Sequence, residues 1–430
     1  MALTPLSLFG YALPALFLAA LYLPLFSYVT PFYVAERGVD LAAIGLLWIA
    51  IRLFDAVSDP LMGWISDRTQ SRFGRRRLWL ALSLPLLCVA TWQAFMPPQG
   101  AGLAHAGIWL FLLTLGWTMA QTPYAAWGAE MASTYAERTR VTAWREALVI
   151  TGTLAATIVY FAAGEGGDGL SALALTVCIG LPLAVVVAFA LAPDRATEPP
   201  AKLTVSAGWQ ALRENKPFQR LILAWFANGA ANGIPVTLFL FFVADRLGAP
   251  EAAGGALIAY FLAAILAVPG WTWLAGRLSK HRAWGIAMLW ACAIFAGALA
   301  LEEGDIAAFY AIAILTGFAF GADLALPPAI QADVIALDTQ RTGARRAGLF
   351  FAMWQVVTKA ALAFSSGLAL IALERAGFQA GGENTPTALM TLSILYAGVP
   401  IILKLIAVAL MWRFSLDRET VDALTPASSS

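Results

Sequence analysis

The sequence predicts an all-α membrane protein with twelve transmembrane helices, and two observations carry that prediction. The 430 residues are 60% hydrophobic and only 12% charged, whereas soluble domains carry about 25% charged residues. The missing charges leave long gaps, for example over residues 1–35 and 221–244, and about 20 apolar residues suffice for a helix to cross a bilayer. This composition excludes a secreted disulfide scaffold, a nucleic-acid binder and a disordered tail.

Charge gaps and Pro/Gly-rich turns divide the chain into twelve spans. They lie near residues 6–34, 41–66, 77–97, 104–130, 140–163, 169–192, 218–245, 252–276, 283–301, 306–333, 346–373 and 386–412. The longest polar stretch separates two sets of six, so we expect an N-terminal bundle over 1–192, a linker over 193–217, a C-terminal bundle over 218–414 and a tail over 415–430. The first apolar run lacks a basic flank and a cleavage site, so we interpret it as a helix and not as a signal peptide.

Lysine and arginine gather in the loops of one side of this topology. Of 27 such residues, 20 lie in loops of that side and three in loops of the other; four lie inside spans, namely Arg52, Arg145, Lys359 and Lys404. The positive-inside rule therefore places the basic side and both termini in the cytoplasm, and the chain in a plasma or inner membrane.

The two sets of six spans echo one another. The segments at 59–79 and 268–284 align with a constant offset of 209, which matches Pro60 with Pro269 and Arg68 with Arg277. Two six-helix halves in parallel repeat are the architecture of major-facilitator transporters, whose substrate site lies near mid-membrane. The basic loop 67–77 then acts as a cytoplasmic latch or only as topology-setting charge.

The second span holds the densest set of charges: Arg52, Asp55 and Asp59. Asp55 and Asp59 are four residues apart and share one helix face. Two carboxylates this close repel unless they hold a proton or a cation, and oxygen ligands suit Na⁺. Ser58 adds a hydroxyl on a neighbouring face, while a structural ion pair with Arg52 is the alternative.

A polar stripe follows in the fourth span, where Thr118, Gln121 and Tyr124 recur every three residues. Such a stripe lines a transport path or joins helices by hydrogen bonds. In the fifth span, Arg145 binds an anionic substrate group or pairs with its neighbour Glu146.

Four further side chains are candidates in the second half. Asn228 and Asn232 share a face of the seventh span, which Gly233 and Pro235 are expected to interrupt, and interrupted helices point to binding sites. Lys359 has no acid close in sequence and must find a counter-ion or touch substrate. Trp354 offers a ring on which a sugar or an acyl chain stacks, or it packs.

Two other ionisable groups have weaker claims to a role in transport. Asp323 is flanked by Gly317 and Gly321, which suit close helix packing, so the sequence supports a functional role and a structural role equally. Lys404 is expected to extend towards the cytoplasmic interface from the twelfth span.

At the second span the chain resembles a known family. RLFDAVSDPLMGWISDRTQSRFGRRRLWL (52–80) is similar to the signature of the glycoside–pentoside–hexuronide:cation symporters, the melibiose-permease-like branch of the major facilitator superfamily. The segments 122–146 and 332–364 resemble that family's span IV–V and span X–XI regions.

The resemblance implies roles residue by residue. Asp55 and Asp59 would bind the coupling Na⁺, Li⁺ or H⁺, with help from Ser58 and Thr118. Lys359 would lie beside the cation and substrate sites, and Arg145 would contribute to sugar binding.

The chain also departs from the family's pattern. The galactoside-binding members carry an acid in span I, which has none here, and another at the position of the neutral Gln121. The span V and XI segments are at least as similar to animal lysophosphatidylcholine transporters, which keeps amphiphilic lipids open as substrates.

We therefore predict a symporter that imports a small solute, most suitably a sugar or glycoside, with Na⁺ or H⁺. It would need no organic cofactor, and Asp55 and Asp59 would hold the metal if the ion is Na⁺. Its partners would be the solute, the cation and the bilayer, without nucleic acid, and it would be a monomer. An intramembrane enzyme would need a nucleophile–base pair or a metal set. The sequence has no histidine deep inside a span and no motif such as HExxH, so we do not expect an enzyme. A non-transporting sensor is the remote alternative.

Overall fold

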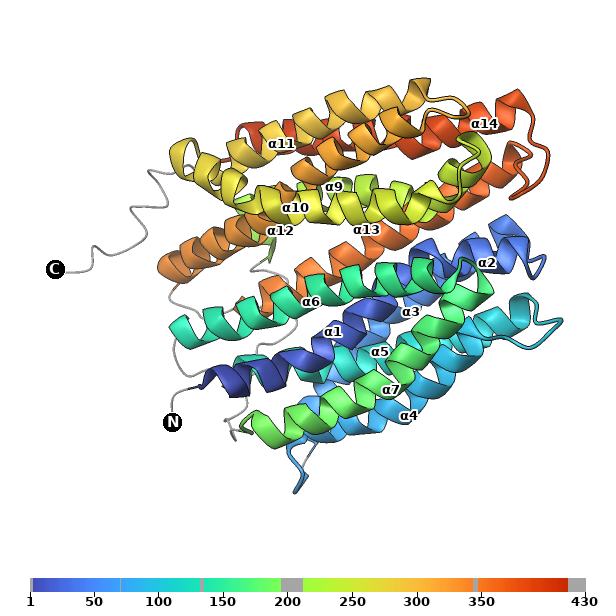
Figure 1. Ribbon diagram of the computed structural model, residues 1–430. Coiled ribbons are helices and arrows are strands. Elements are labelled where there is room, and N and C mark those ends of the chain that lie inside the picture. The colour runs from blue at the N-terminus through green and yellow to red at the C-terminus, as the bar shows by residue number, and fades with distance from the viewer. Residues whose placement is uncertain (1–2, 70, 132–134, 195–211, 343–346, 417–430) are drawn as a thin grey trace. The chain divides into compact units, whose positions relative to one another are not determined.

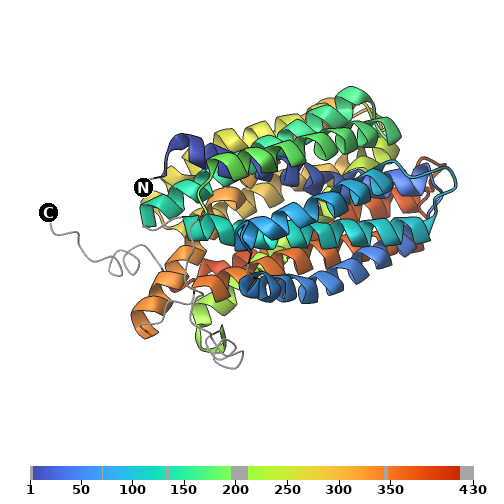
Figure 2. The same cartoon turned by 90° about the horizontal axis from the view of Figure 1, so that it is seen from below.

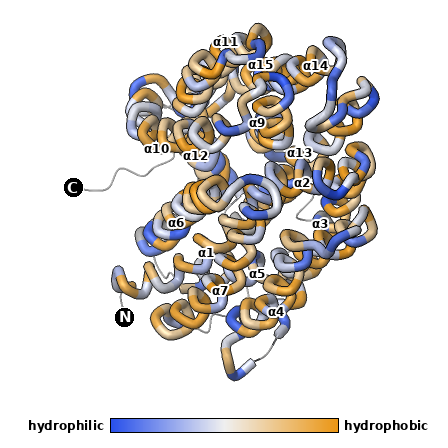
Figure 3. The backbone as a smooth tube through the Cα atoms, turned by 45° about the vertical axis from the view of Figure 1, so that its right-hand side comes forward, coloured by the Kyte–Doolittle hydropathy of each residue, from blue (hydrophilic) through white to orange (hydrophobic). Residues whose placement is uncertain are grey.

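The computed structural model describes residues 3–69, 71–131, 135–194, 212–342 and 347–416, and it is built from helices (Figure 1). Among the described residues, twelve helices are long and apolar enough to cross a membrane. The prediction of twelve spans is thereby confirmed. The tube in Figure 3 shows the same pattern, with apolar helices joined by more hydrophilic turns.

Contacts divide the chain into two compact units, Met1–Pro200 and Ala201–Ser430, and each is described by itself. Most of the predicted linker 193–217 and of the tail 415–430 lies outside the described residues, so those domain boundaries stay a prediction.

The first unit holds six spanning helices. They are α1 (Pro5–Ser27), which the short α2 (Val29–Ala35) continues, α3 (Leu41–Arg68), α4 (Arg75–Phe95), α5 (Leu103–Met131), α6 (Tyr135–Ala163) and α7 (Gly167–Leu191). Local sequence sets the ends of several. Thr4 caps α1 by accepting a hydrogen bond from the Ser7 amide, and Asp40 caps α3 through the Ala43 amide. Such caps satisfy backbone donors that a helix start leaves without a partner.

The second unit also holds six spanning helices. They are α9 (Lys216–Phe241) with the π-turn η1 (Phe242–Arg246), α10 (Ala252–Arg277), α11 (Lys280–Phe295) with η2 (Ala296–Ala300), α12 (Ile306–Thr342), α13 (Ala347–Arg375), and α14 (Pro386–Ser393), which η3 (Ile394–Gly398) joins to α15 (Val399–Trp412). In Figures 1 and 2, α12 is one long helix that ends in orange. It runs nine residues past the predicted end at 333.

The two units use the same pattern of helix packing. In the first, α1 packs on α6 and α7, α3 and α4 pack on α5, and α4 packs on α7. In the second, α9 packs on α13 and α15, α10 and α11 pack on α12, and α11 packs on α15. The pairs correspond one to one in chain order, as a repeat of six helices requires.

The repeat extends to single side chains. Arg68 lies over the Trp64 ring at 3.9 Å, and Arg277 lies over the Trp273 ring at 4.3 Å, each one turn along its helix. These positions are again 209 apart. Two cation–π contacts at equivalent helix ends support the internal repeat more firmly than sequence similarity does.

Ion pairs join the third and fourth spans of each unit. Arg75 and Arg76 both donate to Glu130, at 2.8 and 2.7 Å, and Lys280 donates to Asp333 at 2.7 Å. The basic loop 67–77 thus holds more than topology-setting charge, because its arginines fix the end of α5. Its role as a latch during transport stays a prediction.

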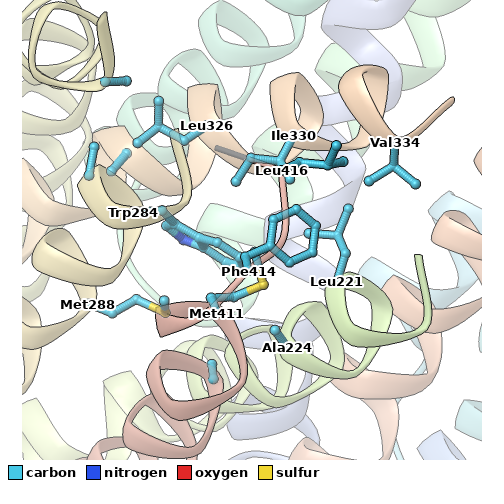
Figure 4. Close-up of a cluster of buried hydrophobic side chains, with 14 of the residues drawn as sticks. Leu221, Ala224, Trp284, Met288, Leu326, Ile330, Val334, Met411, Phe414 and Leu416 are labelled. Carbon is cyan, nitrogen blue, oxygen red and sulfur yellow. The ribbon is translucent and has the colours of Figure 1, made fainter. Parts of the chain in front are cut away.

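The core of the second unit is a cluster of buried apolar side chains from α9, α10, α11, α12, α13 and α15. Figure 4 shows Trp284 among Met288, Met411 and Phe414. This packing holds these helices of the unit together.

Glycines allow α10 and α12 to approach closely. A Cβ at Gly317 would lie 2.3 Å from the Tyr260 carbonyl oxygen, and one at Gly321 would lie 2.5 Å from the Ala264 carbonyl oxygen. Backbone carbonyls cannot move away as a flexible side chain can. The two glycines therefore set the distance between these helices, as small residues do in membrane bundles.

We expect Gly317→Ala to destabilise the protein by about 1–3 kcal/mol, because the added methyl overpacks a backbone contact. The control is Gly270→Ala in α10, where a Cβ meets nothing within 4 Å, and where alanine favours the helix. Thermal unfolding in detergent should show a lower midpoint for Gly317→Ala and no decrease for Gly270→Ala. Equal midpoints for the two variants would contradict this account of the contact.

Candidate functional site

The acidic pair lies on one face of α3. Asp55 is almost fully buried, and Asp59, one turn later, is half-buried. The helix continues through Pro60, although proline has no N–H to donate to the carbonyl oxygen four residues back. The face thus presents two carboxylates that lie one helical turn apart.

Arg52 neutralises one of the two acids. Its guanidinium donates to Asp55 at 2.8 Å, and both side chains are buried. It also lies 4.5 Å from the centroid of the Phe26 ring, which fixes its position by a cation–π contact. The ion pair that the sequence left open as an alternative is therefore present. The charges of Arg52, Asp55 and Asp59 sum to −1.

Asp59 is joined to α5 by Thr118. The buried Thr118 hydroxyl donates to an Asp59 oxygen at 2.8 Å, which brings together two residues 59 apart in the chain. Ser58 is buried but directs its hydroxyl to the Asp55 backbone carbonyl at 3.5 Å. The structure therefore assembles Asp59 with Thr118, while the Ser58 hydroxyl turns to its own helix.

The rest of the polar stripe on α5 has a mixed environment. Tyr124 is buried, stacks on Tyr11 at 4.8 Å and donates to the Tyr11 carbonyl oxygen at 2.6 Å. Of the two roles expected for the stripe, Tyr124 therefore has that of joining helices, because these contacts hold α1 against α5. Gln121 is half-buried and lies between Thr118 and Tyr124 on that face.

Arg145 forms the local pair that the sequence allowed. Its guanidinium donates to Glu146 at 2.7 Å on α6, where Glu146 is more than half exposed. An exposed pair of neighbours is weakly held. A substrate anion could displace Glu146, so the predicted role of Arg145 in substrate binding stays a prediction.

The candidates on α13 lie in the second unit. Trp354 is buried and stacks on Trp225 with 4.4 Å between ring centroids, and the Trp225 indole donates to Thr358 at 2.6 Å. One face of Trp354 is thus covered, which favours packing over a stacking platform. Lys359, one residue after Thr358, is half-buried. Its predicted interaction with the α3 acids concerns both units and stays a prediction.

A second buried charge cluster was not foreseen from the sequence. Asp323 on α12 accepts hydrogen bonds from Trp284 on α11 at 2.6 Å, from Asn232 on α9 at 3.0 Å and from Lys404 on α15 at 3.4 Å. Lys404 also donates to Asn228 at 2.7 Å. Four helices of one unit meet at this carboxylate.

Two expectations about this region are wrong. Lys404 does not extend to the interface, because its ammonium is held by Asn228 and Asp323 and its side chain is only 12% exposed. The helix of Asn228 is not interrupted at Gly233 and Pro235 either. α9 continues to Phe241, because a proline removes only one helical hydrogen bond and the packed neighbours compensate for it.

The family of the chain follows from its sequence similarity. The model of the MFS/sugar transport proteins matches residues 10–418. The chain belongs to this family. It is therefore a multi-pass membrane transporter of the symporter type, and the resemblance to the glycoside–cation symporters is confirmed.

Relatives in the family have different substrates in their names. The chain is 26% identical to YagG of Escherichia coli, a candidate glycoside/cation symporter, over 92% of this chain and 88% of YagG. It is 25% identical to the E. coli inner membrane symporter YicJ, over 90% and 86%. It is also 25% identical to the human sodium-dependent lysophosphatidylcholine symporter 1, over 86% and 75%.

Solved structures agree with the fold. The nucleoside transporter NupG, as its D323A mutant, superposes with a TM-score of 0.69 at 14% identity, over 94% of this chain and 99% of NupG. A D-xylose–proton symporter superposes with a TM-score of 0.64 at 16% identity, over 96% and 97%. At this identity the likeness concerns the fold alone.

The donor set on α3 and α5 fits a small monovalent cation. Among the described residues, no group of three or more His, Cys, Asp or Glu side chains could hold a metal. Na⁺ accepts carboxylate, hydroxyl and carbonyl oxygens, and a proton needs only one carboxylate. The same residues therefore suit either ion, but the role of Thr118 differs. Its hydroxyl oxygen would be a ligand of Na⁺, whereas a proton on a carboxylate would not need it.

This difference gives a test of the ion. Thr118→Val keeps the shape and removes the hydroxyl oxygen, so the Na⁺ concentration for half-maximal uptake should rise about tenfold or more, because the site loses an oxygen that positions its ligand. A proton site would keep its pH dependence. The measurement is solute uptake into proteoliposomes against Na⁺ and against pH.

The matched control is Thr114→Val, one turn earlier on α5. Thr114 is also buried, but its hydroxyl donates to the Leu110 carbonyl of its own helix. If Thr118→Val behaves like Thr114→Val against both ions, Thr118 has no part in the cation site.

Proposed function

We propose that the protein is a cation-coupled symporter that imports a sugar or glycoside together with Na⁺ or H⁺. The observation that carries the proposal is the acidic pair of the buried Asp55 and the half-buried Asp59, of which Asp55 is matched by Arg52 and Asp59 is bonded to Thr118. Charged groups at membrane depth are costly and mark ion or substrate paths.

The charge count supports one coupling ion. Arg52, Asp55 and Asp59 together carry −1 when all are ionised, and one Na⁺ or one H⁺ would bring the site to zero. Binding would thus remove the cost of a net charge in the membrane. If the site is neutral only with its cation bound, the conformational change that exposes it to the other side of the membrane is favoured when the cation is present. Coupled transport requires this preference.

Carbohydrates are supported as the solute class by the family's description and by relatives. The chain is 23% identical to an isoprimeverose transporter of Lactiplantibacillus pentosus over 91% of its length. The side chains Gln121, Asn228 and Asn232 are neutral hydrogen-bonding groups, which suit hydroxyls. Gln121 in place of an acid and the acid-free α1 argue against a galactoside.

A second candidate solute is a lysophospholipid. Its support is the similarity to the human lysophosphatidylcholine symporter, which is as high as the similarity to YicJ. Under both candidates the chain works in a cell membrane, as the name of YicJ says of that protein, and the basic loops and termini face the cytoplasm. We expect a monomer.

We expect Asp59→Asn to abolish cation-driven accumulation, because the site then carries no net charge to be neutralised. Exchange of internal for external solute should remain, since it needs no cation gradient. Uptake and exchange in proteoliposomes measure the two separately. The control is Asp40→Asn, which removes a carboxylate from the same helix at its cap, where an asparagine oxygen accepts the same bond.

Full cation-driven uptake by Asp59→Asn, and likewise by Asp55→Asn, would refute the assignment of the coupling site. Loss of uptake in Asp40→Asn as well would show that the charge of α3, and not the site, is what transport needs.

The solute class is tested by thermal unfolding of the purified protein with methyl glucoside, methyl xyloside, methyl α-galactoside, glucuronate and lysophosphatidylcholine, each with and without Na⁺. A ligand at 100 times its Kd stabilises the native state by about 2.7 kcal/mol. We expect a glycoside to raise the midpoint and the galactoside to leave it unchanged. A rise with lysophosphatidylcholine alone would select the second candidate.

A further inference from the structure

The cluster around Asp323 fixes the orientation of two amides. Lys404 can only donate, so the end of the Asn228 amide that faces its ammonium at 2.7 Å must be the oxygen. The Asp323 carboxylate, ionised beside Lys404, can only accept, so the end of Asn232 that faces it at 3.0 Å must be the nitrogen. The chemistry of the ion pair thus decides both amide orientations.

The two amides are left with opposite free ends. The Asn228 nitrogen is buried and has no hydrogen-bond partner in the described part of the chain, so it is a donor that awaits an acceptor. Asn232 has committed its nitrogen to Asp323 and turns its oxygen, an acceptor, elsewhere. The two side chains are four residues apart on α9, a rise of about 6 Å along one helix face.

We propose that Asp323 and Lys404 are a positioning pair that holds Asn228 as a donor and Asn232 as an acceptor for the hydroxyl groups of the transported solute. The inference rests on the proposed transport of a sugar or glycoside, and it identifies the side chains of α9 that would bind this solute. Neither Asp323 nor Lys404 needs to touch the solute.

The charge balance of the cluster selects a neutral ligand. Asp323 and Lys404 cancel one another, and Trp284 and both asparagines are neutral, so the cluster offers no net charge to a phosphate or a quaternary ammonium. A hydroxyl both donates and accepts, and it therefore matches an N–H and a C=O one turn apart. The cluster thus favours a polyhydroxylated solute over a lysophospholipid.

A buried donor without a partner also argues against a purely structural cluster. Native proteins satisfy nearly all buried polar groups, and each exception calls for an explanation. An ion pair that served only to join helices would not need Asn228, since Lys404 and Asp323 already contact each other. A solute oxygen that accepts a hydrogen bond from the Asn228 nitrogen would give this buried donor its partner.

The experiment measures binding of the methyl glycoside that stabilises the wild type most, and of its monodeoxy derivatives. In the wild type, removal of the hydroxyl that Asn228 contacts should weaken binding about three- to tenfold. In Asn228→Ala the parent and that deoxy derivative should bind alike. The same loss of discrimination is expected in the double variant Asp323→Asn/Lys404→Met, whose core stays neutral and keeps its volume.

The control variant is Trp284→Phe. It removes one donor from Asp323 but leaves the contacts of Asn228 and Asn232 in place, so it should keep the wild-type discrimination between parent and deoxy derivative. Cation binding measured in the absence of solute should be unchanged in all variants, because the acids of the cation site belong to α3. This readout separates positioning from a general loss of folding.

Two results would overturn the proposal. One is full discrimination against the deoxy derivative in the double variant, which would show that the amides need no ion pair. The other is an equal loss in Trp284→Phe, which would make the cluster structural. A wild type that binds none of the glycosides would instead refute the proposed sugar transport, and the positioning role with it.

Discussion

A charged side chain inside a membrane helix must be matched, and for Asp55 and Asp323 the match lies within the same six-helix unit. Arg52 meets Asp55 on α3, and Lys404 meets Asp323 across α15 and α12. Removing one partner of a buried pair costs several kcal/mol because it leaves an uncompensated charge. The helices α12 and α15 therefore cannot shift far apart without that cost, and the contact of Lys404 with Asp323 thereby constrains their packing.

Packing and polar contacts have different roles in holding the helices together. The apolar surface of the helices faces lipid as readily as it faces protein, so hydrophobicity alone gives no helix a specific neighbour. Specific approach comes from residues such as Gly317 and Gly321, where backbone meets backbone. Specific register comes from bonds such as Thr118 to Asp59 and Trp284 to Asp323. The same pattern of helix packing recurs in the two units.

Sequence alone predicts the parts of this architecture that depend on local composition. Twelve spans follow from hydropathy, the acidic pair of α3 follows from helical spacing, and the pair of Arg145 and Glu146 follows from their adjacency in the chain. The pair of Asp323 and Lys404 does not, because 81 residues separate the two and an isolated lysine near a helix end is expected to reach for water. The continuity of α9 through Pro235 could not be predicted for a related reason. A proline disfavours a helix locally, but packed neighbours that are distant in sequence compensate for it.

The two polar sites differ in charge, and this difference gives the proposed transport cycle its logic. The charges of Arg52, Asp55 and Asp59 sum to −1, so a cation would balance them, whereas the Asp323 cluster sums to zero and presents neutral donors and acceptors. In the proposed scheme a cation and a neutral solute therefore need not compete for the same groups. Coupling must then arise because both sites influence the same conformational equilibrium, since a ligand shifts that equilibrium only by its difference in affinity between the states. In such a scheme a substitution in one site changes the apparent affinity of the other only through that equilibrium. The coupling between cation and solute is accordingly reciprocal, as linkage requires.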